Sequence, residues 1–178
     1  MREILYAGFG GQGVLTSGLV MSQVAVHSGQ NATWMPSYGS AMRGGTANCT
    51  VKYGRDTIYN PGQEEPDLLL AMNGPSFNAF SGMVKNGGII LVNSDIMTGD
   101  LDVREDIALH RVACTTLAQK IGQPRGANII MAAAVIKLLN DFSMEDGIKG
   151  MNDMFEKKGK GKFADGNTKA FECGYNAV

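Results

Sequence analysis

Residues 4–14 read Ile4-Leu5-Tyr6-Ala7-Gly8-Phe9-Gly10-Gly11-Gln12-Gly13-Val14. Ile4–Ala7 is short, apolar and typical of a buried strand, while the apolar residues spread through Val14–Ser28 predict a helix. Gly29 follows as a residue that readily takes positive φ, which is a common way for a helix to stop. A buried strand joined to an apolar helix by a glycine-rich turn is the opening unit of an α/β fold.

The turn between that strand and that helix fits the pattern G-x-G-x-x-G. Glycines allow a tight turn and let a ligand come close to the backbone. The N-terminus of the following helix offers free N–H groups and a partial positive charge. The residues that we expect to contact a phosphate-bearing ligand here are Gly8, Gly10, Gly11, Gln12 and Gly13.

A dinucleotide site of the usual kind also needs an Asp or Glu about 20 residues after the turn, where it holds the ribose hydroxyls. Residues 4–55 contain no Asp or Glu, and their charged residues are Arg43, Lys52 and Arg55. The sequence therefore speaks against NAD in its usual pose. Two alternatives stay open, namely a tight turn that packs against another chain and a contact with the phosphate of a different ligand.

A second glycine-rich segment reads Ser37-Tyr38-Gly39-Ser40-Ala41-Met42-Arg43-Gly44-Gly45-Thr46. The guanidinium of Arg43 is a rigid bidentate donor that suits phosphate or carboxylate, although a lone arginine is more often solvated or ion-paired. The paired glycines after it allow close backbone contacts. The members of this segment that we expect to join the first turn at the carboxyl end of the sheet are Tyr38, Arg43, Gly44, Gly45 and Thr46.

Two short apolar segments predict strands in this part of the chain. We expect Thr33–Met35 to be a strand that ends at Pro36. We expect Cys49–Tyr53 to pair with Thr57–Tyr59 in a β-hairpin whose turn is Gly54-Arg55-Asp56.

The remaining chain continues the alternation of strands and helices. Asp67–Met72 and Gly88–Asn93 are apolar runs typical of central parallel strands, and His110–Ala113 is expected to add one more. The expected helices are Ser76–Val84, Thr115–Ile121, Asn128–Leu139, Ser143–Lys157 and Phe163–Val178. This order predicts an α/β fold, a three-layer sandwich with a mixed, mostly parallel central sheet, helices on both faces and one β-hairpin.

Composition excludes several classes of protein. The 178 residues carry a net charge of −1, which does not suit a nucleic-acid binder. No apolar run is long enough to span a membrane and no signal peptide is visible, so we expect a cytoplasmic protein. Cys49, Cys114 and Cys173 are too far apart in the sequence for a zinc or iron–sulfur motif, and we expect no metal on this chain alone.

Charged and titratable residues outside the two glycine-rich segments have ordinary explanations. Lysines 157, 158, 160 and 162 form a positive cluster after a predicted helix, where they suit the negative end of the helix dipole. A contact between this cluster and an acidic partner such as ferredoxin is the alternative. His27 and His110 have no catalytic motif around them, and we expect no catalytic residue.

Taken together, these motifs resemble the gamma subunit of the 2-oxoacid:ferredoxin oxidoreductases, which include the pyruvate, 2-oxoglutarate, 2-oxoisovalerate and indolepyruvate enzymes. The matching segments are residues 7–14, 37–39, 42–47, 66–71 and 87–93, with Asn167, Ala170 and Gly174 in the last helix. The resemblance covers nearly the whole chain. It departs from many relatives at Ser40-Ala41, where Pro-Glu is expected, and this departure argues against a role for an acid in the segment.

The resemblance implies a single gamma-type domain over residues 1–178 that is a structural subunit of a larger enzyme. Such enzymes oxidatively decarboxylate a 2-oxoacid with coenzyme A as co-substrate, giving an acyl-CoA, CO2 and reduced ferredoxin. The implied partners are alpha and beta subunits, with thiamine diphosphate and Mg2+ between them and iron–sulfur clusters in beta or in a small ferredoxin-like delta subunit. Ferredoxin is the implied electron acceptor.

The same resemblance implies a role for the two glycine-rich segments. They are expected to line a subunit interface and to help hold the phosphate-bearing part of coenzyme A, with Arg43 as the charged contact. Two alternatives are a free-standing nucleotide-binding oxidoreductase, which only the first glycine turn supports, and a free-standing α/β module that binds phosphate-bearing small ligands.

Overall fold

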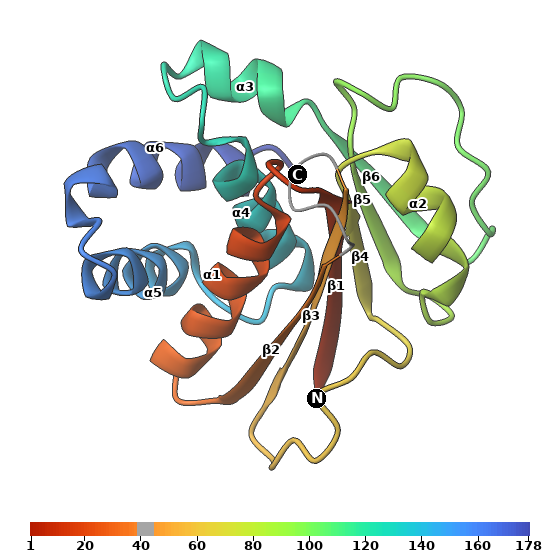
Figure 1. Cartoon of the computed structure of the whole chain (residues 1–178), viewed down its shortest axis with the longest axis horizontal. Helices are drawn as coiled ribbons and strands as arrows, with labels where there is room; N and C mark the ends of the chain where they lie inside the picture. The colour runs from red at the N-terminus through yellow and green to blue at the C-terminus, as the bar shows by residue number, and fades with distance from the viewer. Residues whose placement is uncertain (39–44) are drawn as a thin grey trace.

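A computed structural model describes residues 1–38 and 45–178 of the chain. Within these residues six strands form one sheet in the order β2-β3-β1-β4-β5-β6, and helices lie on both faces of it (Figure 1). The strands are β1 (Arg2–Phe9), β2 (Asn31–Tyr38), β3 (Thr46–Gly54), β4 (Leu68–Ala71), β5 (Ile89–Asn93) and β6 (Ala108–Val112).

The sheet is mixed and mostly parallel, as predicted. Strand β1 lies near its centre and pairs in parallel with β4, which continues in parallel through β5 to β6. Strand β3 pairs antiparallel with both β1 and β2. The carboxyl ends of β1, β4 and β5 therefore meet at one edge of the sheet, where ligand sites of open α/β sheets form.

The predicted pairing within the hairpin is wrong. Residues 57–59 form no strand, and β3 pairs instead with β2, so that the hairpin joins Asn31–Tyr38 to Thr46–Gly54. The physical reason is that β3 already lies between two strands, with Cys49 opposite Tyr6 of β1 on one side and opposite Pro36 of β2 on the other. Neither edge of β3 is free for a further strand.

The predicted end of the second strand at Pro36 is also wrong. Strand β2 runs on through Pro36 to Tyr38, and β3 begins at Thr46, so the segment predicted as a loop contributes residues to both strands. Proline donates no backbone hydrogen bond and is tolerated on edge strands. Strand β2 is such an edge, because among the described residues β3 alone pairs with it.

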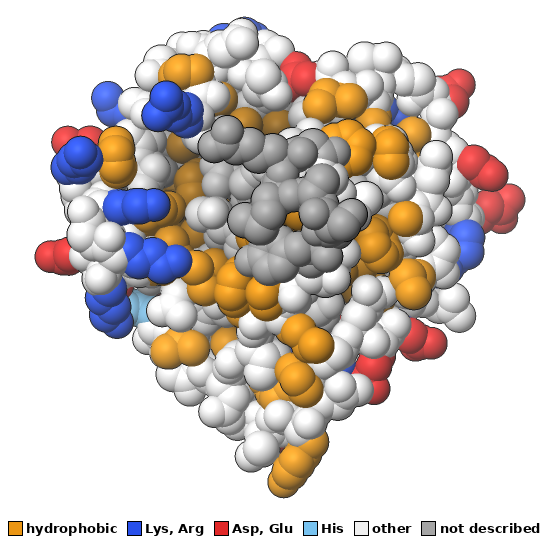
Figure 2. Space-filling view, in the orientation of Figure 1, with side chains coloured by type: hydrophobic (Ala, Val, Ile, Leu, Met, Phe, Trp, Pro, Cys, Tyr) orange, Lys and Arg blue, Asp and Glu red, His pale blue; other side chains and the backbone are white. Residues whose placement is uncertain are grey.

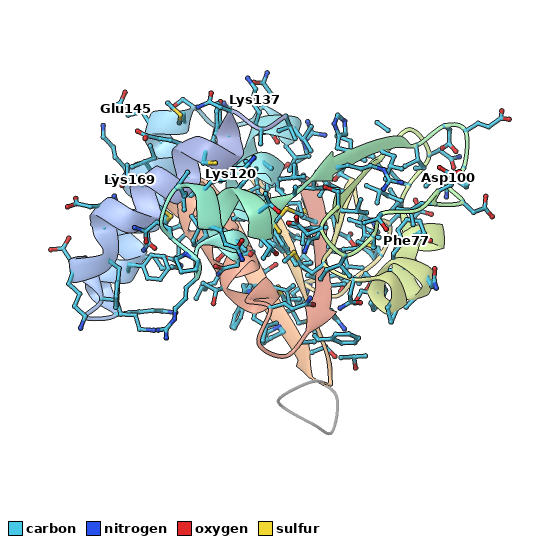
Figure 3. The ribbon with its side chains drawn as sticks, turned by 90° about the horizontal axis from the view of Figure 1, so that it is seen from above. Phe77, Asp100, Lys120, Lys137, Glu145 and Lys169 are labelled. Carbon is cyan, nitrogen blue, oxygen red and sulfur yellow. The ribbon has the colours of Figure 1, made fainter. Side chains whose placement is uncertain are left out.

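The helices divide unequally between the two faces. The helix bounds are α1 (Val14–His27), α2 (Gly74–Phe80), α3 (Cys114–Lys120), α4 (Ala127–Leu139), α5 (Met144–Lys157) and α6 (Ala164–Tyr175), with short 3-10 helices at Ser81–Met83 and Gly161–Phe163. Viewed from above, α2 lies on the opposite side of the sheet from α3 and α6 (Figure 3). The three predicted layers are therefore confirmed.

Each face of the sheet has its own apolar core. On one face the side chains of α1, α4, α5 and α6 pack against alternate residues of the central strands, such as Tyr6 and Leu70. On the other face Phe77 of α2 covers Leu5 and Leu69. Helix α4 is apolar around most of its circumference, with Lys137 exposed, because it is packed by α1, α3, α5 and α6. No helix among the described residues is long and apolar enough to cross a membrane.

Helix α6 crosses α4 at a point where the two backbones touch. A methyl group at position 174 would overlap the carbonyl oxygen of Ile130. We therefore expect Gly174→Ala to lower the free energy of unfolding by about 1–3 kcal/mol, the usual cost of overpacking, as measured by urea denaturation. Gly74→Ala is the control, because an added methyl meets no atom within 4 Å there. Equal effects of the two substitutions would contradict this crossing.

Candidate functional site

The glycine turn lies at the carboxyl edge of the sheet, between the end of β1 at Phe9 and the start of α1 at Val14 (Figure 1). Its neighbours are the residues that follow β4, because the Met72 N–H donates to the carbonyl of Ala7 across 2.9 Å. Elements that are distant in the sequence therefore meet at the turn. This is the place in the sheet where the sequence predicts a ligand or partner contact.

Backbone geometry and packing account for the glycines of the turn. Gly11 and Gly13 have φ values of 102° and 76°, which side chains of L-residues disfavour. A Cβ on Gly13 would lie 2.8 Å from Asn128 of α4, and a Cβ on Gly8 would lie 2.7 Å from Val14. Gly13 and Gly8 are thus required by close packing. The turn is tight and packs against α4 of the same chain, whereas its packing against another chain and the ligand contact both stay predictions.

Gln12 ties the turn to the segment after β4. Its Oε1 accepts hydrogen bonds from the Phe9 N–H (2.7 Å) and from Nδ2 of Asn73 (2.8 Å). Its Nε2 donates to the carbonyl of Met72 at 3.4 Å. Asn73 in turn caps α2, because its Oδ1 accepts from the Ser76 N–H at 2.9 Å. The polar atoms of the Gln12 side chain are therefore engaged in hydrogen bonds within the chain.

The N-terminus of α1 has no side-chain cap and no acidic residue in its first turn. The first intrahelical N–H bond is that of Ser17, which donates to the carbonyl of Gly13 at 3.0 Å. The Ser17 hydroxyl donates to the carbonyl of Asn128 at 2.8 Å and thereby ties α1 to α4. The partial positive charge of the helix end is thus not offset by a carboxylate of its own first turn, which favours an anion nearby.

The second glycine-rich segment meets the first through its C-terminal part. The Gly10 N–H donates to the carbonyl of Gly45 at 2.9 Å, and Thr46 pairs with Phe9 in the sheet. Tyr38 is the last residue of β2 and stands opposite Ala47. Arg43 and Gly44 lie outside the described residues. The expected meeting of the two segments is therefore seen for Gly45 and Thr46.

The other two cations of the acid-free stretch lie at the opposite end of the sheet. Lys52 pairs with Glu3 in register, and its buried ammonium forms ion pairs with Glu3 (3.3 Å) and with Glu64. Arg55 follows the end of β3 at the same edge. Neither side chain is close to the glycine turn. Lys52 and Arg55 belong to the same acid-free stretch of sequence as the glycine turn, but they lie far from it in the fold. Strand β3 runs antiparallel to β1 and carries its later residues away from the turn.

A buried thiol lies beneath the first turn of α1. The Cys49 Sγ–H donates to the carbonyl of Val14 at 3.7 Å, and its residue is fully buried. Burial raises the pKa of Cys49 to about 12, so the thiol stays protonated at neutral pH. A protonated, enclosed thiol is a poor nucleophile. Cys49 therefore acts as a packing residue against Gly18 of α1.

From the sequence we did not identify Asn73 and Asn128, two residues from other parts of the chain whose side chains contact the turn. Asn73 had a local signal, because an asparagine followed by Gly74-Pro75 is a typical helix start. The expected start of that helix at Ser76 is accordingly two residues late. Asn128 had no such signal, because its contact with Gly13 joins elements more than 100 residues apart.

Comparison with protein families gives one match over nearly the whole chain. The family model described as pyruvate ferredoxin/flavodoxin oxidoreductase matches residues 3–177. The ketoisovalerate oxidoreductase subunit VorA of Methanothermobacter marburgensis is 37% identical over 176 residues, which are 97% of this chain and 35% of that protein. The chain thus spans about a third of the length of that relative. The 2-oxoglutarate synthase subunit KorC of Methanocaldococcus jannaschii is 30% identical over 99% of this chain and 94% of its own length.

Solved structures with the same fold include one that is named a gamma subunit. The gamma subunit of keto/oxoacid ferredoxin oxidoreductase from Geobacter sulfurreducens has a TM-score of 0.81 and 28% identity, covering 99% of this chain and 98% of that one. The 2-oxoglutarate:ferredoxin oxidoreductase of Magnetococcus marinus, solved with 2-oxoglutarate, coenzyme A and succinyl-CoA, has a TM-score of 0.85 and 21% identity over 99% of this chain and 31% of its own. At that identity the second likeness shows the fold alone.

The role of Gln12 predicts a measurable loss of stability on its replacement. We expect Gln12→Leu to lower the free energy of unfolding by about 1–3 kcal/mol, because it leaves the Phe9 N–H and Nδ2 of Asn73 without their acceptor. Urea denaturation measures the change. Gln119→Leu on the exposed face of α3 is the matched control and should alter stability by less than about 0.5 kcal/mol. A Gln12→Leu chain as stable as the control would show that these bonds contribute nothing net.

Proposed function

This chain belongs to the pyruvate ferredoxin/flavodoxin oxidoreductase family as a domain of the gamma type, and we propose that it is the gamma subunit of an enzyme that oxidatively decarboxylates a 2-oxoacid. In that reaction the bond between the carboxylate and the 2-oxo carbon breaks and CO2 leaves. The thiol sulfur of coenzyme A bonds to the acyl carbon and its proton is released. The electron pair passes to ferredoxin.

The single observation that carries this proposal is the family match over residues 3–177, supported by relatives named for ketoisovalerate, 2-oxoglutarate and pyruvate. Relatives that share one domain but differ in the 2-oxoacid of their names suggest that the domain serves a common step. Loss of CO2, transfer of the acyl group to coenzyme A and electron transfer are common to those oxidations, and the acyl transfer is the step that brings in a phosphate-bearing co-substrate. In this proposal thiamine diphosphate, Mg2+ and the iron–sulfur clusters belong to the partner alpha, beta and ferredoxin-like subunits.

We infer that the contribution of this chain is to position coenzyme A at the carboxyl edge of its sheet. The support is the junction of the two glycine-rich segments through Gly10 and Gly45, beside the uncapped N-terminus of α1. Arg43 belongs by sequence to the connection that leaves this junction. An arginine there would supply a charged donor for a phosphate, to which the nearby helix end adds partial positive charge.

Assembly with partner subunits is the first test of the proposed function. Tagged chain isolated from its native cell extract without oxygen should bring down thiamine-diphosphate-binding subunits. The isolated material should reduce a viologen dye only when both a 2-oxoacid and coenzyme A are present. A chain that is isolated alone, from an extract in which such activity is detected, would contradict the subunit role.

The assembled enzyme also tests the contact with coenzyme A. We expect Arg43→Ala to raise the KM for coenzyme A about tenfold or more, because a hydrogen bond to a charged group contributes about 1.5–3 kcal/mol. The KM for the 2-oxoacid should stay the same. Arg55→Ala is the matched control, since Arg55 is exposed at the opposite end of the sheet. An unchanged KM for coenzyme A in a normally assembled Arg43→Ala enzyme would remove Arg43 from the site.

A further inference from the structure

A cavity of about 710 Å³ lies among α1, α4, α5 and α6, on the helical side of the molecule. Its lining includes Thr16 of α1, the α3–α4 connection at Arg125, Phe155 of α5 and Asn167 of α6. We call this the basic cavity and define it further by Asn128, Lys160 and Lys162. Its size falls within the range of small-molecule sites, about 300–1,000 Å³.

Residues at the starts of three helices line the basic cavity. Thr16 belongs to the first turn of α1, Gly126 is the N-terminal residue before α4, and Phe163 is the N-terminal residue before α6. None of these three helix starts has a side-chain cap. Asp165 is the acidic residue in the first turn of α6, but it is exposed and does not line the cavity. Three uncapped helix starts beside one space favour an anion in it.

Three cationic side chains, Arg125, Lys160 and Lys162, line the same space, and no carboxylate of the part of the chain that the structure describes does so. Within residues 1–38 and 45–178 none of the three forms an ion pair. The Lys162 ammonium lies 5.1 Å from the ring centre of Phe163. Figure 2 shows that Lys and Arg gather on the side of the molecule where α5 and α6 lie, while Asp and Glu lie mostly on the other side. All three residues are exposed, so water screens their mutual repulsion in part, and an anion between them would lower it further.

Apolar and aromatic groups complete the lining. Phe155, Phe163 and Ile129 lie among the polar residues of the cavity. A flat apolar ring can pack on such side chains, whereas a small inorganic anion gains no favourable contact from them. An acidic protein surface would reach the exposed lysines at the rim. It would not reach the first turn of α4, where Ile129 is buried and Asn128 is half-buried. The lining therefore favours a small ligand with both a phosphate and a ring.

We propose that the basic cavity binds a phosphate-bearing nucleotide, with its phosphate at Arg125, Lys160, Lys162 and the helix starts and its base against Phe155 and Phe163. A free nucleoside diphosphate and the nucleotide end of coenzyme A share this chemistry. The cavity shares the start of α1 with the site proposed at the glycine turn but none of that site's candidate residues, and its test uses the chain alone, so it can fail or succeed separately from the proposed function. Asn128 lies between the two places, since it lines the cavity and packs on Gly13.

Calorimetric titration of the full chain tests the proposal, with ADP, adenosine 3′,5′-bisphosphate and inorganic phosphate as separate probes. We expect the triple substitution Arg125→Ala, Lys160→Ala, Lys162→Ala to weaken nucleotide binding about tenfold or more. The matched control is Lys157→Ala, Lys158→Ala, Lys169→Ala, which removes the same charge from exposed positions outside the lining (Lys169 is labelled in Figure 3). The control should stay within about twofold of the unsubstituted chain.

A second measurement locates the ligand. In nuclear magnetic resonance spectra, ADP should shift the amide signals of Thr16, Asn128 and Asn167, and the triple substitution should abolish these shifts. Tighter binding of adenosine 3′,5′-bisphosphate than of ADP would assign the cavity to the nucleotide end of coenzyme A, and equal binding would assign it to a free nucleotide.

Three results would overturn the proposal. The first is that the unsubstituted chain binds no nucleotide. The second is an equal loss of binding in the two triple variants, which would make the lysines a general electrostatic surface, as for an acidic partner protein. The third is binding of inorganic phosphate as tight as that of ADP, which would leave the aromatic lining without a role. None of these results bears on Arg43, whose test is the KM for coenzyme A in the assembled enzyme.

Discussion

The close contact between the glycine turn and α4 is the constraint on which the surroundings of the site depend. Only glycine fits at position 13, because the residue has positive φ and a Cβ would run into Asn128. This contact sets the distance between α1 and α4, and the Ser17 hydroxyl secures it by bonding the carbonyl of Asn128. Both candidate ligand sites lie next to that contact, since the glycine turn precedes α1 and the basic cavity is lined by Thr16 and Asn128.

The buried ion pairs gather at one end of the sheet, while Asp95, just after β5 at the other end, accepts hydrogen bonds from the start of α3. Buried carboxylates and their partners lie at the amino edge of β1, where Glu3 pairs with Lys52 and where Asp67 pairs with Arg2 and Lys85. At the carboxyl edge, residues 4–55 supply no acid. An anion at the carboxyl edge therefore meets backbone N–H groups and helix ends without a nearby carboxylate from this stretch. Such a distribution suits a subunit that receives a phosphate-bearing co-substrate.

Local pattern was a good guide where one element settles its own structure. The helix over Val14–His27, its stop at Gly29 with φ of 77°, and the buried strands β4 and β5 agree with the sequence within a residue or two. The sequence pattern did not predict which strands pair with each other. Cys49–Tyr53 reads as a strand in any context, but its partner depends on which neighbours occupy its two edges, and a proline on the edge strand does not interrupt that pairing.

The sequence by itself determined the α/β class, the glycine turn and the family, because these follow from short-range spacing and from residues that only certain backbones tolerate. Only the tertiary structure decided what surrounds them. It placed Lys52 at the far end of the sheet, brought Asn73 and Asn128 to the turn, and gathered Arg125, Lys160 and Lys162 around one hollow. The physical reason is that strand order and helix crossings are set by burial summed over the whole chain, which no local stretch of sequence records.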